Sequence, residues 1–152
     1  MKLMGPALVI TAVLGIAALA HAQKDSAGQE QKQDLQGTWT ATGTKGYNKD
    51  AARDFQNLQM TVKGDALIAK YGDKTARATY KLILTKAGPS QMDVTVMDGP
   101  EAVKGKPFKC IYLLEGNTLK VTYRDPGKER PSTFTDEGEA GVYTVFFKKE
   151  KN

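Results

Sequence analysis

Residues 78–97, ATYKLILTKAGPSQMDVTVM, contain two short alternating segments separated by a turn. In both segments, apolar side chains occupy every second position and mostly polar or charged side chains lie between them. Alternation with period two is typical of a half-buried β-strand, because successive side chains point to opposite faces. The intervening KAGPS contains the glycine, proline and serine that tight turns favour. The stretch therefore predicts a β-hairpin with one apolar face.

The same pattern continues on both sides of this hairpin and predicts an all-β fold. Turn signals bound eight predicted strands, at 36–43, 58–63, 66–71, 75–85, 91–97, 107–114, 118–124 and 141–149. Most connections are short, so consecutive strands should pair antiparallel. Such a meander can close into an eight-stranded up-and-down barrel, which buries the apolar face and removes exposed edges. An open sandwich is the alternative. One short helix is expected at 48–58, after the first strand.

The N-terminus has the layout of a secretory signal peptide. Lys2 precedes a 14-residue apolar run at 7–20, and small residues follow in AHA at 20–22. A membrane anchor is the alternative, but a span needs about 20 apolar residues. We therefore expect cleavage after Ala22 and a protein exported to the periplasm or the extracellular space, with no membrane span remaining. The predicted organisation is a signal peptide at 1–22, a flexible leader at 23–34 and a barrel domain at 35–150.

Cleavage would leave the protein without histidine and with a single cysteine, two residue types on which many catalytic and metal sites depend. The only histidine, His21, would be lost, and Cys110 is the only cysteine of the chain. A Ser–His–Asp triad, a His/Cys zinc site and an intramolecular disulfide are then excluded, and no phosphate-binding or dinucleotide-binding motif is present. We expect a protein that is not an enzyme and holds no cofactor or metal. Cys110 alternates with aromatic residues and should be buried rather than reactive.

The positive charge of the chain does not predict a nucleic-acid partner. Loss of Lys2 would lower the 22 basic residues to 21 against 17 acidic ones, a net charge of +4. These charges are mixed along the chain, without a block of five or six of one sign.

The one tryptophan, Trp39, lies in the first predicted strand, two residues after Gly37. The glycine permits a tight bend into the strand, and the indole is expected to plug one end of the barrel. Gly-x-Trp at this position resembles the signature of the lipocalin superfamily. That resemblance implies that an arginine late in the chain packs over the indole. Of Arg124 and Arg130, Arg130 is preferred because it precedes the last strand.

A longer series of segments resembles one family more specifically. The segments are LQGTWT (35–40), YKLIL (80–84), MDVTV (92–96), CIYLLEGNTLKVTY (110–123) and PGKERPSTF (126–134). In this order they are similar to a family of small exported, lipocalin-like domains first described from planctomycete genomes. The resemblance covers nearly the whole predicted domain and implies a lipocalin-like barrel. It implies no activity, because function does not follow from fold.

The candidate site is the interior of the barrel. Tyr80, Met92, Tyr112 and Tyr123 fall on its predicted inner face, and the three tyrosine hydroxyls need partners once buried. This cup would suit a small apolar or amphipathic ligand with one polar group. Alternatively, the side chains fill the barrel, and the protein binds an envelope partner, as an inhibitor or assembly factor, through loops 98–107 and 125–131. An enzyme using paired carboxylates is the third hypothesis.

Overall fold

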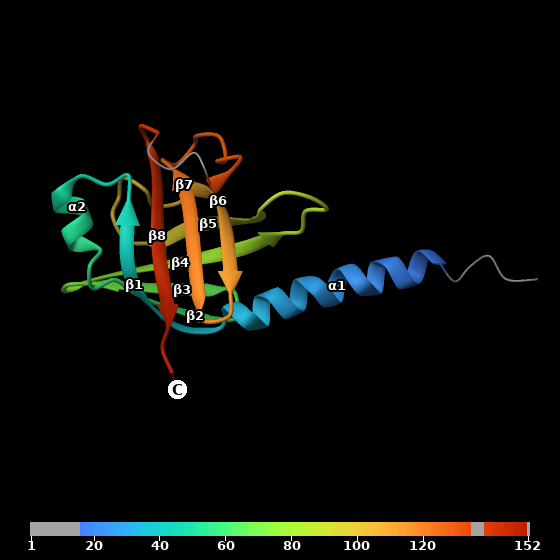
Figure 1. Cartoon of the computed structure of the whole chain (residues 1–152). Helices are drawn as coiled ribbons and strands as arrows, with labels where there is room; N and C mark the ends of the chain where they lie inside the picture. The colour runs from blue at the N-terminus through green and yellow to red at the C-terminus, as the bar shows by residue number, and fades with distance from the viewer. Residues whose placement is uncertain (1–15, 135–138, 152) are drawn as a thin grey trace, which may run out of the picture.

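The strands form one closed antiparallel barrel in which β1 pairs with β8 (Figure 1). The computed structural model describes residues 16–134 and 139–151. The strands are β1 (Gly37–Lys45), β2 (Gln59–Lys63), β3 (Ala66–Tyr71), β4 (Lys74–Ile83), β5 (Ser90–Asp98), β6 (Pro107–Glu115), β7 (Thr118–Arg124) and β8 (Val142–Lys149). The predicted eight-stranded up-and-down barrel is confirmed, and each strand lies where the alternation placed it.

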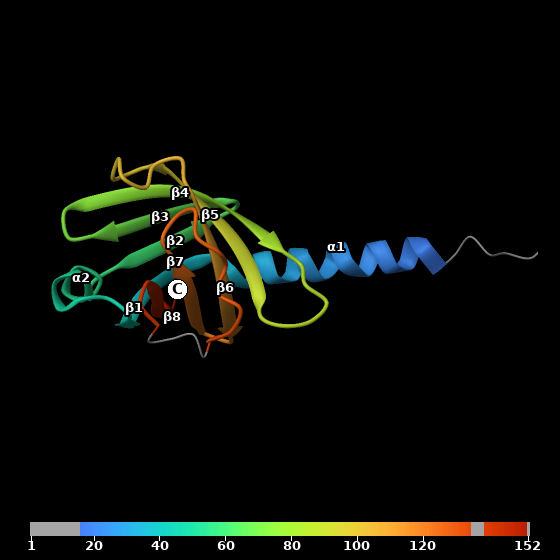
Figure 2. The same ribbon diagram turned by 90° about the horizontal axis from the view of Figure 1, so that it is seen from above.

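Two helices lie on opposite sides of the barrel (Figures 1 and 2). The short helix α2 (Lys49–Asp54) joins β1 to β2, as predicted. Its N-cap is Asn48, whose side-chain oxygen accepts a hydrogen bond of 2.8 Å from the backbone N–H of Ala51. This contact satisfies one of the donors that a helix N-terminus leaves open.

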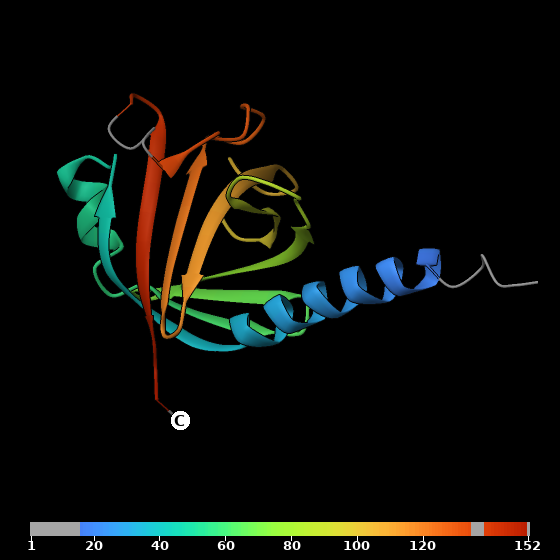
Figure 3. The same ribbon diagram turned by 45° about the vertical axis from the view of Figure 1, so that its right-hand side comes forward.

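Helix α1 (Ile16–Leu35) projects from the barrel and leads directly into β1 (Figures 1 and 3). The expectation of a flexible leader at 23–34 is therefore wrong for the structure described. The physical reason is that this segment is rich in Gln, Lys, Glu and Ala, which favour helix, and contains no proline. Residues 1–15 of the predicted signal peptide lie outside the described residues. Over the residues described, neither helix is long and apolar enough to cross a membrane.

Alternate residues of every strand point into a common core. The buried members of this core are Leu35, Trp39, Ala41, Leu58, Val62, Leu67, Tyr80, Met92, Cys110, Tyr112, Leu119, Val145 and Phe147. Leu35 belongs to α1, so the end of this helix is part of the barrel core.

A second buried cluster lies on the outside of β6, β7 and β8. Ile111, Thr122 and Thr144 are register partners on adjacent strands and alternate with core residues, so they face outward. All three are nevertheless buried, and so is Pro131 of the β7–β8 connection. The part of the connection around Pro131 therefore packs against the outer surface of the sheet.

The two buried threonines of this cluster form a pair that can be tested by a double-mutant cycle. The hydroxyls of Thr122 and Thr144 are 2.8 Å apart, and the residues are 0% and 1% exposed. Replacing either with valine leaves the other hydroxyl buried without its partner, and we expect a loss of about 1–3 kcal/mol in the free energy of unfolding. The double valine variant should lose less than the sum, as measured by urea denaturation. Additive losses would show that the two hydroxyls do not depend on each other.

Candidate functional site

The interior of the barrel holds a partly open cavity of about 210 Å³. Strands β2 to β8 contribute to its wall, with Leu35 and Phe55 from the two helical regions. The wall is almost entirely apolar. Its aliphatic members include Val62, Leu67, Ala76, Ala78, Met92, Val94, Val96, Leu119, Val121 and Val145.

Three of the four predicted pocket residues line this cavity: Tyr80, Met92 and Tyr123. Tyr112 is buried but lies outside the cavity wall, and its hydroxyl donates a hydrogen bond of 3.0 Å to the side-chain oxygen of Gln31 in α1. The expectation that Tyr112 lines the pocket is therefore wrong. Its position near the end of β6 brings it to α1, which the sequence analysis had treated as a flexible leader.

The tyrosine hydroxyls at the cavity are bonded to other protein groups. Tyr80 donates to the backbone carbonyl of Gly64 at 2.9 Å, and the hydroxyl of Tyr123 contacts that of Tyr47. The sequence analysis expected tyrosine hydroxyls that a ligand could bond. In the structure, the hydroxyls of Tyr80 and Tyr123 are already bonded to protein groups. A ligand in the cavity would meet hydrocarbon surface rather than hydrogen-bonding groups.

Ionisation of these tyrosines is suppressed. Burial raises the pKa of Tyr80 above its ordinary value. Burial likewise raises the pKa of Tyr123, and the neighbouring Tyr143 and Asp125 add to this shift. A phenol ionises only near pH 10 even in water, so both side chains are neutral at physiological pH. The cavity wall therefore carries no charge from its tyrosines.

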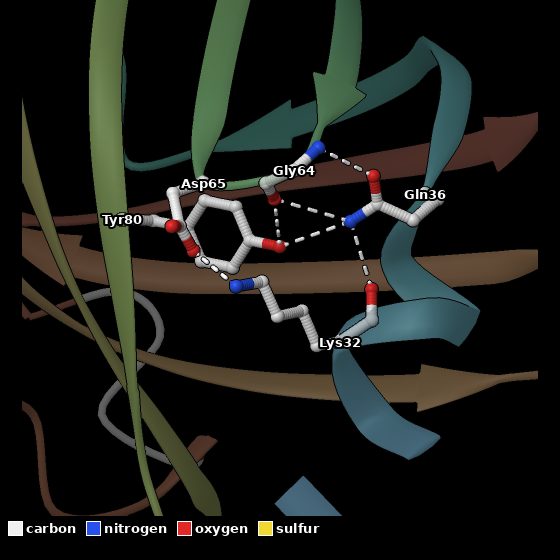
Figure 4. A network of polar contacts seen from close by, with 5 residues as sticks. All are labelled: Lys32, Gln36, Gly64, Asp65 and Tyr80. Atoms are coloured by element: carbon white, nitrogen blue, oxygen red, sulfur yellow. Dashed lines mark hydrogen bonds and ion pairs between the residues drawn. The ribbon is translucent and has the colours of Figure 1, made fainter. Parts of the chain in front are cut away.

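A polar network joins α1 to the barrel at one end (Figure 4). The side-chain amide of Gln36 donates to the backbone oxygen of Lys32 at 2.9 Å and to the Tyr80 hydroxyl at 3.2 Å, and its oxygen accepts from the N–H of Gly64 at 2.7 Å. Lys32 also forms an ion pair with Asp65. Gln36 thus satisfies a carbonyl at the helix C-terminus while fixing the helix to the β2–β3 turn.

Trp39 lies in the barrel core near this same end. Its side chain is completely buried, and its indole N–H donates to the backbone oxygen of Leu35 at 2.8 Å. Gly37 has a φ of +118°, and a Cβ there would lie 3.0 Å from the Lys149 side chain. Glycine is therefore required for the bend that the sequence analysis inferred.

The cation over the indole is Lys149, whose ammonium lies 5.2 Å from the ring centroid. Arg130 is placed elsewhere: its guanidinium donates to the backbone oxygens of Met92 at 3.0 Å and Cys110 at 2.7 Å, and pairs with Asp93 at 2.7 Å. The expectation that Arg130 packs over Trp39 is not met. Arg130 instead fixes the β7–β8 connection to β5 and β6, because that connection folds back onto the outer sheet surface.

Aromatic side chains gather at the other end of the barrel, beside α2. Centroid distances of 4.8–6.3 Å link successive rings into one group. We call this group the aromatic collar; its members are Tyr47, Phe55, Tyr71, Phe108, Tyr123 and Tyr143. Phe55, Phe108 and Tyr123 also line the cavity, so the collar forms the cavity wall at this end.

Cys110 is buried in the cavity wall as an unpaired thiol. Burial raises its pKa from 9.0 to about 12, against a smaller opposing effect of Arg130. At pH 8 we expect the folded thiol to react with a disulfide reagent about a thousand-fold more slowly than the unfolded thiol, because only the thiolate reacts. The raised pKa also means that stability falls as pH rises above about 9, where the unfolded thiol ionises first. Labelling with and without urea measures the first effect, and equal rates would contradict it.

The sequence analysis missed several side chains that build this site. Leu35 and Gln36 were at the start of the predicted barrel domain, directly after the leader, and Phe55 was in the helix predicted at 48–58. The apolar Leu35 directly before the Gly-x-Trp segment was the available signal that the leader ends in the core.

No model of a known protein family matches the sequence, and a search of the curated proteins finds no match either. The architecture and the cavity therefore carry the functional argument.

Proposed function

We propose that this protein is an exported, lipocalin-like domain that binds a small apolar molecule inside its barrel. The observation that carries the proposal is the cavity of about 210 Å³ with an apolar wall. Export and the resemblance to the planctomycete family rest on the sequence motifs, and the barrel is compatible with both.

The size of the cavity limits the class of ligand. A protein cavity of about 150 Å³ lined by aliphatic and aromatic residues stays dry and binds benzene. The cavity here is somewhat larger. It would hold a monocyclic aromatic compound with a small substituent, or a short hydrocarbon chain.

The chemistry of the wall further restricts the ligand. Buried charges and unpaired polar groups cost several kcal/mol when no partner is present. Because the tyrosine hydroxyls at Tyr80 and Tyr123 already have partners, an uncharged apolar molecule fits better than one with a buried polar group. This refines the amphipathic ligand of the sequence analysis to an apolar one.

Filling the cavity tests the proposal. Ala78 lines the cavity and pairs with Leu67 and Val96, which also line it. The substitution Ala78→Leu should abolish binding of toluene, monitored by calorimetry and methyl NMR shifts, while leaving unfolding stability unchanged or raised. The matched control is Thr79→Leu, which places the same side chain on the exposed outer face of β4.

The expected result is toluene binding by the unmodified protein and by Thr79→Leu, and none by Ala78→Leu. Benzoate, the charged analogue, should not bind to any of them. Failure of the unmodified protein to bind toluene, or equal binding by the two leucine variants, would contradict the proposal.

The alternative of a filled barrel that acts through its loops is less well supported. The cavity argues against a filled interior, and part of the 125–131 loop is already engaged: Pro131 is buried and Arg130 bonds β5 and β6.

A further inference from the structure

The outer surface of β2, β3 and β4 carries an unusual distribution of charge. These three adjacent strands contain five basic residues and no acidic residue. Four of the basic residues alternate with core positions and point outward, where they are exposed: Lys63, Lys70, Arg77 and Lys81. We call these four residues and the strand surface between them the basic face.

Acidic residues border the basic face on β5 and in the β2–β3 turn. Within residues 16–134 and 139–151, no salt bridge joins any of the four to an acidic side chain. Asp65, in the turn between β2 and β3, pairs with Lys32, and Asp93, the register partner of Lys81, pairs with Arg130. Asp98 lies opposite Arg77 on β5. On β7 and β8, by comparison, Arg124 pairs with Glu139 and Lys149 lies over Trp39.

The spacing of these cations indicates the kind of partner. No two of them face each other in the register of the sheet: Lys63 lies opposite Ala66, and Lys70 lies between Gln59 and Thr75. They are spread over three strands and do not converge on one point. A single small anion needs converging donors, and a polyanionic chain is usually held along a groove. A two-dimensional array of separated cations matches a surface of separated negative charges.

We propose that the basic face docks the protein on a membrane surface that contains anionic lipid. Each lysine or arginine near such a surface contributes about 1 kcal/mol, equivalent to about a five-fold change in affinity. Docking of this kind is peripheral and requires no membrane-spanning segment. It is separate from ligand binding, because the basic face and the cavity lie on opposite surfaces of the same strands.

Vesicle sedimentation of the chain beginning at Gln23 tests this proposal. This chain lacks the apolar run at 7–20 but keeps residues of α1 that contact the barrel, among them Gln31, Lys32 and Leu35. The variant Lys63→Gln/Lys70→Gln/Lys81→Gln removes three charges of the basic face. The matched control, Lys86→Gln/Lys106→Gln/Lys128→Gln, removes three exposed charges from loops elsewhere.

We expect the unsubstituted chain to bind vesicles with about 30% phosphatidylglycerol in phosphatidylcholine, and to bind pure phosphatidylcholine at least ten-fold more weakly. The basic-face variant should lose about 100-fold in affinity for the anionic vesicles, and the loop variant less than five-fold. Raising the salt concentration should weaken binding of the unsubstituted chain. All three proteins should unfold at the same temperature.

Three results would overturn the proposal. The first is no binding to anionic vesicles at low salt, and the second is an equal loss in the two triple variants. The third is retention on the polyanion heparin, lost in the basic-face variant, together with no vesicle binding, which would assign the face to a polymer. The Ala78→Leu variant should bind vesicles normally, so failure of this proposal and failure of the ligand proposal are distinguishable.

Discussion

Replacing Trp39 with alanine should lower the free energy of unfolding by about 3–5 kcal/mol, the largest loss that we expect from a single substitution. The side chain is completely buried at the end of the barrel core, where its indole N–H bonds the backbone oxygen of Leu35 at 2.8 Å. Truncation therefore leaves a large void and an unpaired carbonyl at the junction of α1 and β1. It also removes the ring under the Lys149 ammonium. Urea denaturation followed by far-UV circular dichroism measures the loss.

The variant Trp39→Phe separates packing from hydrogen bonding at this position. Phenylalanine keeps an aromatic ring but cannot donate to Leu35, so it should lose only about 1–2 kcal/mol. If Trp39→Ala were as stable as the unmodified protein, the indole would not be closing the barrel. Equal losses in the two variants would show that the hydrogen bond, and not the filling of space, is the main contribution.

Replacing Arg130 with methionine should lower the free energy of unfolding by about 2–4 kcal/mol. The side chain is 17% exposed and bonds two backbone oxygens, those of Met92 and Cys110, in addition to Asp93. Methionine keeps much of the packing volume but leaves all three acceptors without this donor. The β7–β8 connection should then detach from β5 and β6, which amide hydrogen exchange in residues 126–134 would detect.

The matched variant for Arg130 is Asp93→Asn. The carboxylate side chain is 36% exposed, so screening by solvent weakens the ion pair, and the two backbone contacts of Arg130 persist. We expect a loss of about 1 kcal/mol. A larger loss for Asp93→Asn than for Arg130→Met would mean that the ion pair, and not the clamp on the two backbone oxygens, holds the connection.

The barrel was predictable because most strands have a clear period-two alternation in their own local sequence. In β4, alternation places Ala78, Tyr80 and Leu82 inward, and the structure has them lining the cavity or packed against the core. The tight turns and short connections between the predicted strands then left few ways to arrange the strands in a sheet. The inward position of Cys110 followed from the same alternation.

The errors concern contacts between segments distant in sequence. Alternation cannot say which cation reaches the indole, and Lys149 on β8 does so because β8 pairs with β1 on closure. It also cannot say that the β7–β8 connection folds back, which is why Arg130 was assigned to the wrong partner. The prediction for Tyr112 failed for a related reason. The partner of its hydroxyl, Gln31, lies in a segment whose sequence has no apolar pattern that would indicate contact with the barrel.

The volume of the cavity could not be predicted from the sequence. Whether inward side chains fill a barrel of eight strands depends on small differences in their volume and tilt. Ala76 and Ala78 on adjacent inward positions were the visible signal of unfilled space, and both line the cavity.

Diffraction from crystals equilibrated under xenon pressure tests the central claim most directly. Xenon binds in apolar cavities without needing any polar partner. The account predicts one strong xenon peak inside the barrel, bounded by Leu67, Met92 and Val121, in the unmodified protein, and its loss in Ala78→Leu. A barrel interior filled by side chains, with no xenon peak, would contradict it.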